Sequence, residues 1–338
     1  MSATQYAALV SIAATAVAIS SRSPVTLWPA ALQRVLDDNF GVVSACKIHA
    51  SITTLIVAAL GFLGLSIKGK FKVMKPKAPP TPLKGTAAES IVLYDFPSLP
   101  GVASVSHSVS KIHAFLAFAK LPYTTKSTSP DTGPKGKLPY IQHGQNTVPD
   151  SVFIMAYLRN TYGKGQSSGI LAPMDAGKRA RVDSCMALVE QTLPYAVGYY
   201  RVIDPQGFRT LPSLMNKLGV PRLLCGLIAA TMRSQVSKLL YLVGLGRHCR
   251  QDFDWLLQRD LTALSALLGS QVYLFGDEPT DADAVLFANL DVILHDGHMS
   301  PALVDQVKQH DNLVRYTAHI RKTFFADKLK EQAALRRG

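Results

Sequence analysis

Residues 89–163 constrain the fold more than any other part of the chain, because patterns typical of strands and helices alternate along them. Short runs rich in β-branched and aromatic residues predict strands, and apolar residues at helical spacing predict helices. The expected elements are a strand at 91–96, a helix at 106–120, a strand at 122–127, a hairpin of strands at 138–143 and 147–149, and a helix at 150–163. The first two strands would be parallel, joined by a right-handed crossover, and the last two antiparallel.

This β-α-β-β-β-α order is typical of a thioredoxin-like module, and a proline stands at the start of its third strand. A cis peptide before Pro139 would leave the backbone N–H and C=O of Leu138 free at a sheet edge, where an extended peptide can pair with them. Asp150 and Ser151 open the next helix, whose free N–H groups favour a carboxylate. Together these features predict a cradle for a small acidic peptide, for which glutathione is the candidate. Taken alone, Asp150 is better explained as a plain N-cap.

The chain from Leu171 onward has the periodicity of packed helices. Even the strongly apolar stretch 212–246 is interrupted by basic residues, so it predicts two soluble helices rather than a membrane span. Thr280 and Asp283 form a capping box before a nearly uniformly apolar run. We interpret this box as structural rather than catalytic, because the terminal N–H groups of a buried helix cannot be left unpaired.

The first 70 residues have the pattern of a membrane anchor region. From Ile48 the sequence carries no charged residue until Lys68, and about 20 apolar residues suffice to cross a bilayer. We therefore predict a transmembrane helix at 45–67; the alternative is a buried core helix. A second apolar run at 4–20 would be another span, a signal-like segment or an amphipathic leader, so the sequence leaves a single or double pass open.

Residues 68–88 form a basic, proline-rich linker between this anchor and the folded body. Lysines directly after a span favour the cytoplasmic side and attract anionic lipid headgroups. A nuclear-localisation or RNA-binding tail is a weaker interpretation, because the segment has no arginine and adjoins the apolar run. The chain has a net charge of +13, but much of the excess lies in this linker and no aromatic-basic platform appears. Nucleic-acid binding is therefore not expected.

Five stretches carry a resemblance to a known family: LYDFP, GKLPYI, PDSVFIMAYL, GLGRH and LFGDEPTDADAVLFANL. They resemble the failed-axon-connections and metaxin branch of the glutathione S-transferase-like proteins, over roughly residues 90 to 325. The resemblance implies a thioredoxin-like domain at 89–163 and an all-helical domain at 170–326. A basic tail is expected after them at 327–338. It also implies a membrane location with the folded body facing the cytosol, for which the mitochondrial outer membrane and the endoplasmic reticulum are both allowed.

The same resemblance assigns roles to individual residues. Pro139 falls on the family's cis proline, and Asp150 and Ser151 fall on the acidic-Ser pair that holds the γ-glutamyl end of glutathione. Ser106 is the best positional match to the residue that activates the thiol, and Ser104 is the next. The thioredoxin-like domain contains no cysteine, which argues against thiol exchange at this site.

Histidines and cysteines offer fewer candidates. We interpret His107 as a solvated helix-start residue and His113 as a polar-face residue, rather than as proton acceptors for a thiol. His295 and His298 lack a third ligand nearby, so no metal site is expected. The four cysteines form no CxxC pair and are interpreted as reduced thiols.

Two functions are open from the sequence. The first is a membrane-tethered, glutathione S-transferase-like protein that acts mainly by binding. Its N-terminal helix and Lys-rich linker would contact the membrane, and protein partners would dock on it there. The second is an active glutathione-dependent transferase or peroxidase that uses Ser106. We favour the first, because an anchor pattern is present, the catalytic cysteine is missing and the activating loop matches poorly.

Overall fold

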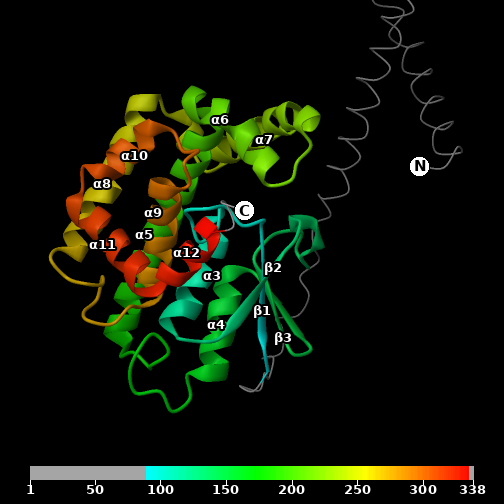
Figure 1. Cartoon of the computed structure of the whole chain (residues 1–338). Helices are drawn as coiled ribbons and strands as arrows, with labels where there is room; N and C mark the ends of the chain where they lie inside the picture. The colour runs from blue at the N-terminus through cyan, green and yellow to red at the C-terminus, as the bar shows by residue number, and fades with distance from the viewer. Residues whose placement is uncertain (1–88, 335–338) are drawn as a thin grey trace, which may run out of the picture. The chain divides into compact units, whose positions relative to one another are not determined.

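The computed structural model describes residues 89–334, and its first part follows the predicted β-α-β-β-β-α order (Figure 1). The elements are β1 (Ile91–Asp95), α3 (His107–Phe118), β2 (Tyr123–Ser127), the 3-10 turn η1 (Pro130–Thr132), β3 (Tyr140–His143), β4 (Asn146–Pro149) and α4 (Ser151–Tyr162). Each predicted boundary is met to within two residues. The apolar periodicity that predicts these elements is also what buries one face of each.

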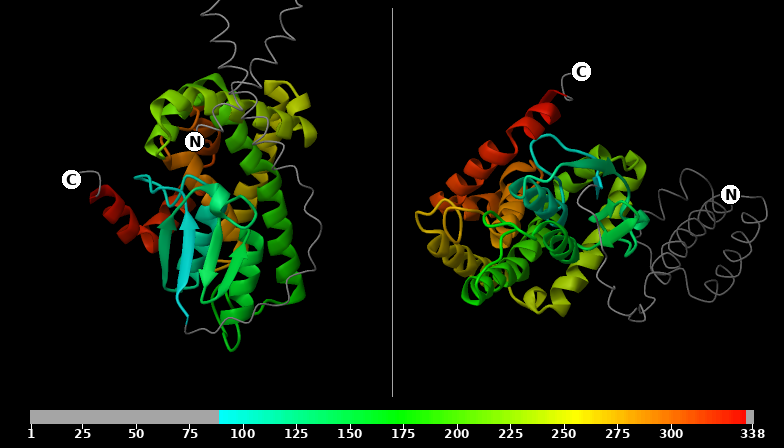
Figure 2. Two further views of the ribbon diagram at one scale, coloured as in Figure 1. Left: turned by 90° about the vertical axis from the view of Figure 1, so that its right-hand side faces the viewer. Right: turned by 90° about the horizontal axis from the view of Figure 1, so that it is seen from below.

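The four strands form one sheet in the order β2-β1-β3-β4. β1 runs parallel to β2 and antiparallel to β3, and β3 pairs with β4 as the predicted hairpin. Successive residues of a strand point to opposite faces, so Ile91 and Leu93 of β1 are buried while Val92 between them is partly exposed. Figures 1 and 2 show α3 and α4 on one face of the sheet, between it and the helical part.

The chain from Ala176 onward is helical, as predicted. Its elements are α5 (Ala176–Gly198), the π-helical turn η2 (Tyr199–Ile203), α6 (Pro205–Lys217), α7 (Arg222–Leu242), the 3-10 turn η3 (Leu245–Arg247), α8 (Arg250–Leu268), α9 (Asp281–His295), α10 (Pro301–Lys308), α11 (Asp311–Phe324) and α12 (Ala326–Ala334). Pro194 lies inside α5, and the π-helical turn begins at Tyr199. The prediction of two packed helices in the apolar stretch 212–246 is confirmed, since α6 and α7 pack against each other.

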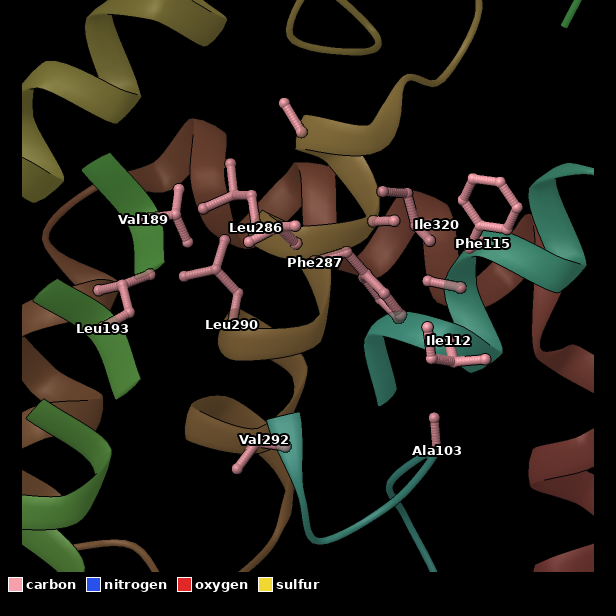
Figure 3. Packing of buried hydrophobic residues seen from close by; sticks show 14 of the residues in the cluster. Ala103, Ile112, Phe115, Val189, Leu193, Leu286, Phe287, Leu290, Val292 and Ile320 are labelled. Carbon is pink, nitrogen blue, oxygen red and sulfur yellow. The ribbon is translucent and has the colours of Figure 1, made fainter. Parts of the chain in front are cut away.

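Helix α9 lies at the centre of the helical part and joins it to the thioredoxin-like part. Every residue from Asp281 to Ile293 is buried, because the sequence is apolar on nearly every side of this helix. Figure 3 shows Phe287 of α9 pointing toward Ile112 of α3, and Leu290 toward Leu193 of α5. One hydrophobic cluster therefore runs through both parts.

Two buried aspartates of α9 tie the parts together through ion pairs. Asp281 accepts hydrogen bonds from Arg159 of α4 at 2.6 Å and from Arg179 of α5 at 2.7 Å. Asp291 pairs with Arg321 of α11 and accepts from a backbone N–H of the loop between β1 and α3 at 3.2 Å. Breaking a buried ion pair leaves its other charge unpaired, so these contacts fix how the two parts meet.

Three predictions concern residues that the structure does not describe. The apolar run 4–20, the span at 45–67 and the linker 68–88 lie outside residues 89–334 and stay predictions. Among the described helices, none has both the length and the apolar content needed to cross a bilayer. The predicted basic tail begins as helix α12.

Candidate functional site

The proline and the Asp-Ser pair of the predicted cradle meet at the end of the β3–β4 hairpin. The Leu138–Pro139 peptide is cis, as the resemblance implied. The N–H of Asp150 donates to the carbonyl of Pro139 at 3.2 Å, next to the paired residues Tyr140 and Pro149. Neither the N–H nor the C=O of Leu138 forms a hydrogen bond with another residue in 89–334. Both groups can therefore pair with an extended ligand.

Asp150 caps α4 while holding an uncommon backbone conformation. One carboxylate oxygen accepts from the N–H of Val152 at 3.1 Å, which is the plain N-cap role. The other oxygen lies 3.9 Å from the ammonium of Lys135, in a solvent-exposed pair that contributes little to stability. Asp150 has φ +77°, and a non-glycine residue in this region costs ~1–3 kcal/mol. Strain of this kind often occurs at binding sites, so the turn is a candidate binding position.

Ser151 begins α4 directly after this turn. The residue is 8% exposed, and its N–H is one of the first four of the helix, which have no intrahelical acceptor. The helix dipole adds a partial positive charge at the same place. A ligand carboxylate would be stabilised there.

Ser106 and Ser104 have different surroundings, although both are candidates for activating a thiol. Ser106 is the N-cap residue of α3, and its hydroxyl forms no hydrogen bond within residues 89–334. Ser104 is buried, and its hydroxyl donates to Asp95 at 2.6 Å. Ser104 is therefore held as a structural donor, and Ser106 is the one of the two whose hydroxyl can meet a ligand.

Ser106 lies in the wall of an apolar cavity of about 720 Å³. The wall is formed by the loops after β1 and β2, the start of α3, the end of α5, and parts of α6 and α7. Its polar groups are few, and they include His107 and Arg201 beside Ser106. A mostly apolar cavity of this size, with a few polar groups, is typical of a small-molecule site. None of the cradle residues lines it, so the structure does not bring Ser106 and the cradle into one cavity.

His107 follows Ser106 at the start of α3 and lines the cavity. Burial, and then the positive charges of Arg201 and Lys111, lower the pKa of its imidazole to about 4. At pH 7 the ring is therefore neutral and can accept a hydrogen bond, but it is too weak a base to hold a proton. His107 is partly buried rather than fully solvated, because it lies in the cavity wall between the start of α3 and the helical part.

A buried polar network that the sequence does not indicate lies around His113. This residue is completely buried, with its Nε2 atom 3.0 Å from Asp95 and its Nδ1 atom 2.8 Å from the hydroxyl of Tyr123. The ammonium of Lys328 on α12 lies 3.0 Å from the same ring. Burial first, and then the charge of Lys328, lower the pKa of His113. The expectation of a polar-face residue is wrong, because partners from two strands and a distant helix enclose it.

The capping box before α9 is confirmed, and its carboxylate does more than cap the helix. Asp283 accepts from the N–H and the hydroxyl of Thr280 at 2.7 and 2.8 Å. It also accepts from the N–H of Leu274 at 2.8 Å and from the hydroxyl of Tyr316 at 3.1 Å. Burial raises the pKa of Asp283, and these hydrogen bonds oppose that shift. Thr280 and Asp283 thus form the capping box that the sequence predicts.

The two histidines near the end of α9 lie beside aspartates. The N–H of His298 donates to the carboxylate of Asp296 at 2.6 Å, and its Nδ1 atom lies 2.8 Å from the carbonyl of the same residue. His295 lies 3.4 Å from Asp291, which is already paired with Arg321. Within residues 89–334 no group of three His, Cys, Asp or Glu side chains could hold a metal ion.

Known proteins similar to this chain correspond to both of its parts. Residues 107–207 match the glutathione S-transferase N-terminal domain, and residues 257–320 match the glutathione S-transferase C-terminal domain. Metaxin-2 of Mus musculus is 27% identical over 222 residues, which cover 64% of this chain and 81% of metaxin-2. Failed axon connections of Drosophila melanogaster is 28% identical over 212 residues, which cover 59% of this chain and 49% of that protein.

An enzyme is also among the similar proteins. Isoprene-epoxide–glutathione S-transferase of Rhodococcus sp. (strain AD45) is 27% identical over 242 residues, which cover 69% of this chain and 99% of the enzyme. Among solved structures, glutathione transferase F2 from Populus trichocarpa has 18% sequence identity and a TM-score of 0.47, covering 73% of this chain and 99% of its own. The similar proteins thus include metaxins as well as a protein named for a glutathione reaction.

Proposed function

Because this chain belongs to the glutathione S-transferase-like superfamily and is similar to metaxins and failed axon connections, we propose that it acts mainly by binding. It would be a metaxin-like protein tethered to a membrane by its N-terminal segment. The folded body would present a glutathione-binding cleft and a docking surface for protein partners to the cytosol. The observation that supports the cleft is that the backbone N–H and C=O of Leu138 are unpaired within residues 89–334 and that α4 starts nearby at Ser151.

The cradle supports glutathione binding through main-chain and dipole contacts. An extended tripeptide can pair with the N–H and C=O of Leu138 as an added strand does. Its γ-glutamyl carboxylate can then lie at the start of α4, where the N–H of Ser151 and the helix dipole favour negative charge. The Asp150 oxygen that faces Lys135 at 3.9 Å can accept from the ammonium group of the ligand.

Three features favour binding over chemistry. Residues 89–163 contain no cysteine, so thiol exchange has no nucleophile in this part. The hydroxyl of Ser104 is committed to Asp95 at 2.6 Å. His107, whose pKa is lowered to about 4, is too weak a base to take the proton of a thiol at pH 7.

The alternative is an active glutathione-dependent transferase or peroxidase. Its support is the unpaired hydroxyl of Ser106 in an apolar cavity of about 720 Å³, together with the similarity to isoprene-epoxide–glutathione S-transferase. A hydroxyl that donates to a thiolate stabilises it and lowers the pKa of the thiol. An apolar electrophile held in the cavity would then be positioned for attack.

Calorimetric titration of the full chain with glutathione tests the proposal, alongside a chlorodinitrobenzene turnover assay. We expect binding without turnover, and binding weakened at least several-fold in Asp150→Asn and in Ser151→Pro, which removes the N–H of residue 151 at a helix position that accepts proline. Thr147→Ala, an exposed change on the neighbouring strand β4, is the control and should bind normally. Turnover that disappears in Ser106→Ala would establish the alternative. If the wild-type chain binds no glutathione, the proposed glutathione-binding cleft is wrong.

Membrane tethering is tested separately, because it rests on residues 1–88. We expect the full chain to sediment with membranes in high salt and a chain lacking residues 1–70 to stay in the supernatant. A shortened chain that still sediments in high salt would place the tether elsewhere. Imaging of the tagged full chain with protease protection would then distinguish the mitochondrial outer membrane from the endoplasmic reticulum.

A further inference from the structure

Helix α7 leaves much more apolar surface exposed than its length would suggest. Its buried residues are Cys225, Ala229 and Leu240, which face the rest of the body. The exposed apolar residues lie at its two ends: Leu223, Leu224, Leu227, Leu239, Tyr241 and Leu242. Leu223 is 96% exposed and Leu242 is 78% exposed. Figure 1 shows α7 at the edge of the body, beside α6.

Five of these exposed residues share one side of the helix, and Leu239 lies off it, toward the direction of Ile228 and Met232. At 3.6 residues per turn, Leu223, Leu227 and Tyr241 point in nearly the same direction, and Leu224 and Leu242 stand beside them. Between the two ends, Ser234 and Lys238 complete the same outward side. A helix of 21 residues is about 30 Å long, so the outward side is a long, narrow surface.

The segment that contains α7 carries positively charged side chains and no negatively charged ones. Between Asp204 and Asp252 the sequence has no acidic residue. It has seven basic residues there: Arg209, Lys217, Arg222, Arg233, Lys238, Arg247 and Arg250. Arg250 pairs with carboxylates, whereas the other six have no carboxylate partner within residues 89–334. Their positive charge can therefore act on an external partner.

Two of these cations lie next to the exposed apolar residues. Lys238 lies on the outward side one turn before Leu242, whereas Arg222 at the first turn points toward the side of the buried Leu240. The guanidinium of Arg247 lies over the ring of Tyr241 at 4.8 Å from its centroid. Long basic side chains can lay their stems on an apolar surface while the charged group reaches polar surroundings, and tyrosine is enriched at the membrane–water boundary.

We propose that the outward side of α7 lies on an anionic membrane surface. Its leucines would enter the boundary between headgroups and acyl chains, and Lys238 and Arg247 would contact lipid phosphates. A second copy of this chain is a poorer partner, because it would bring like charges together. An acidic protein would also match the charge, but it would need a groove complementary to this helix. A lipid surface needs no such groove to take up a helix with exposed apolar residues at its two ends.

This contact uses residues distinct from the glutathione cradle and from the N-terminal segment. The opposite side of α7 lines the apolar cavity through Ile228, Met232 and Val236. The same helix would therefore separate the cavity from the lipid surface. An apolar molecule leaving the membrane would have a short path to the cavity past this helix.

Tryptophan fluorescence of the full chain in vesicles tests the proposal. In a chain carrying Trp28→Phe and Trp255→Phe, Leu242→Trp or Leu223→Trp supplies a single reporter at one end of α7. The vesicles contain phosphatidylcholine with or without phosphatidylserine, and brominated phosphatidylcholine is the quencher. We expect several-fold more quenching with phosphatidylserine than without it, and a decrease as salt screens the charges. Thr147→Trp on β4 is the matched control and should not be quenched.

A charge variant separates this contact from the N-terminal tether. Lys238→Glu with Arg247→Glu should abolish the quenching at Leu242→Trp, while sedimentation in high salt and glutathione binding stay unchanged. Equal quenching in both kinds of vesicle, or none at either reporter position, would overturn the proposal. A blue-shifted emission without vesicles, together with the mass of two copies, would show that a second chain covers α7 and would also overturn it.

Discussion

Helices α9 and α7 are both rich in apolar residues, yet the fold uses them in opposite ways. α9 is buried from Asp281 to Ile293, and its carboxylates all have hydrogen-bond or ion-pair partners: Asp281, Asp283 and Asp291. α7 buries three residues, and Arg222 and Lys238 have no carboxylate partner in the described part of the chain. The apolar content of a helix therefore does not decide whether it becomes a core element. What differs is whether the rest of the fold supplies partners for its charges.

The largest effect is expected from removing the carboxylate at the start of α9. Asp283→Ala would leave the N–H groups of Leu274 and Thr280 and the hydroxyl of Thr280 buried without this acceptor. Unpaired buried donors cost ~1–3 kcal/mol each, so we expect a loss of about 4 kcal/mol in the free energy of unfolding. Guanidinium chloride unfolding measures it. Asp283→Asn keeps one acceptor oxygen, so its free energy of unfolding should fall by less. Equal losses in the two variants would show that packing of the side chain, and not its hydrogen bonds, determines the stability here.

A smaller loss is expected from shortening an apolar side chain of the same helix. Leu290 is completely buried in the cluster that α9 shares with α5. Leu290→Ala should lower the free energy of unfolding by about 3 kcal/mol, because it removes buried methyl groups and leaves a cavity. The same unfolding experiment measures it. A loss below about 1 kcal/mol would contradict the central place given to α9.

Lowering the pH should destabilise the chain through His107 and His113. The pKa of His107 is about 4 in the folded chain and near 6.5 when unfolded, so the unfolded chain binds more protons between these values. Stability should fall as the pH falls from about 6.5 toward about 4. His113, whose pKa is lowered chiefly by burial, acts in the same direction. Unfolding curves across this range should be less pH-dependent for His107→Asn; an unchanged slope would show that His107 is solvated.

The smallest effect is expected on α7. Leu223→Ala removes a side chain that is 96% exposed, so the free energy of unfolding should change by less than about 0.5 kcal/mol. Leu223→Ala and Leu290→Ala make the same chemical change on α7 and α9, so their losses of unfolding free energy can be compared directly. A loss comparable to that of Leu290→Ala would mean that Leu223 is covered in the folded chain, which would remove the contrast between α7 and α9.

The order of the elements and the structural capping box are predictable from the sequence because their signals are local. Strand and helix periodicities decide β1 through α4 within a few residues of each boundary. Thr280 and Asp283 are three residues apart, so their pairing needs no tertiary information. The cis peptide before Pro139 came from the family resemblance, since an X-Pro pair alone does not reveal its isomer.

The surroundings of the candidate site could not be predicted, because they depend on residues far apart in the chain. The partner of Ser104 is Asp95 at the end of a strand, and the network around His113 includes Lys328 from the last helix. The cavity beside Ser106 needs α6 and α7 to form its wall. The exposure of Leu223 was also not predicted, since a helical pattern shows which residues share a side but not whether anything covers it.

Hydrogen exchange at the backbone amide of Leu138 tests the proposed cleft most directly. In the free chain this N–H has no partner among residues 89–334, so it should exchange rapidly. Saturating glutathione should slow its exchange by at least an order of magnitude if a bound tripeptide pairs with it, while the amide of Thr147 on β4 stays unchanged. Exchange at Leu138 that is the same with and without glutathione would contradict the account.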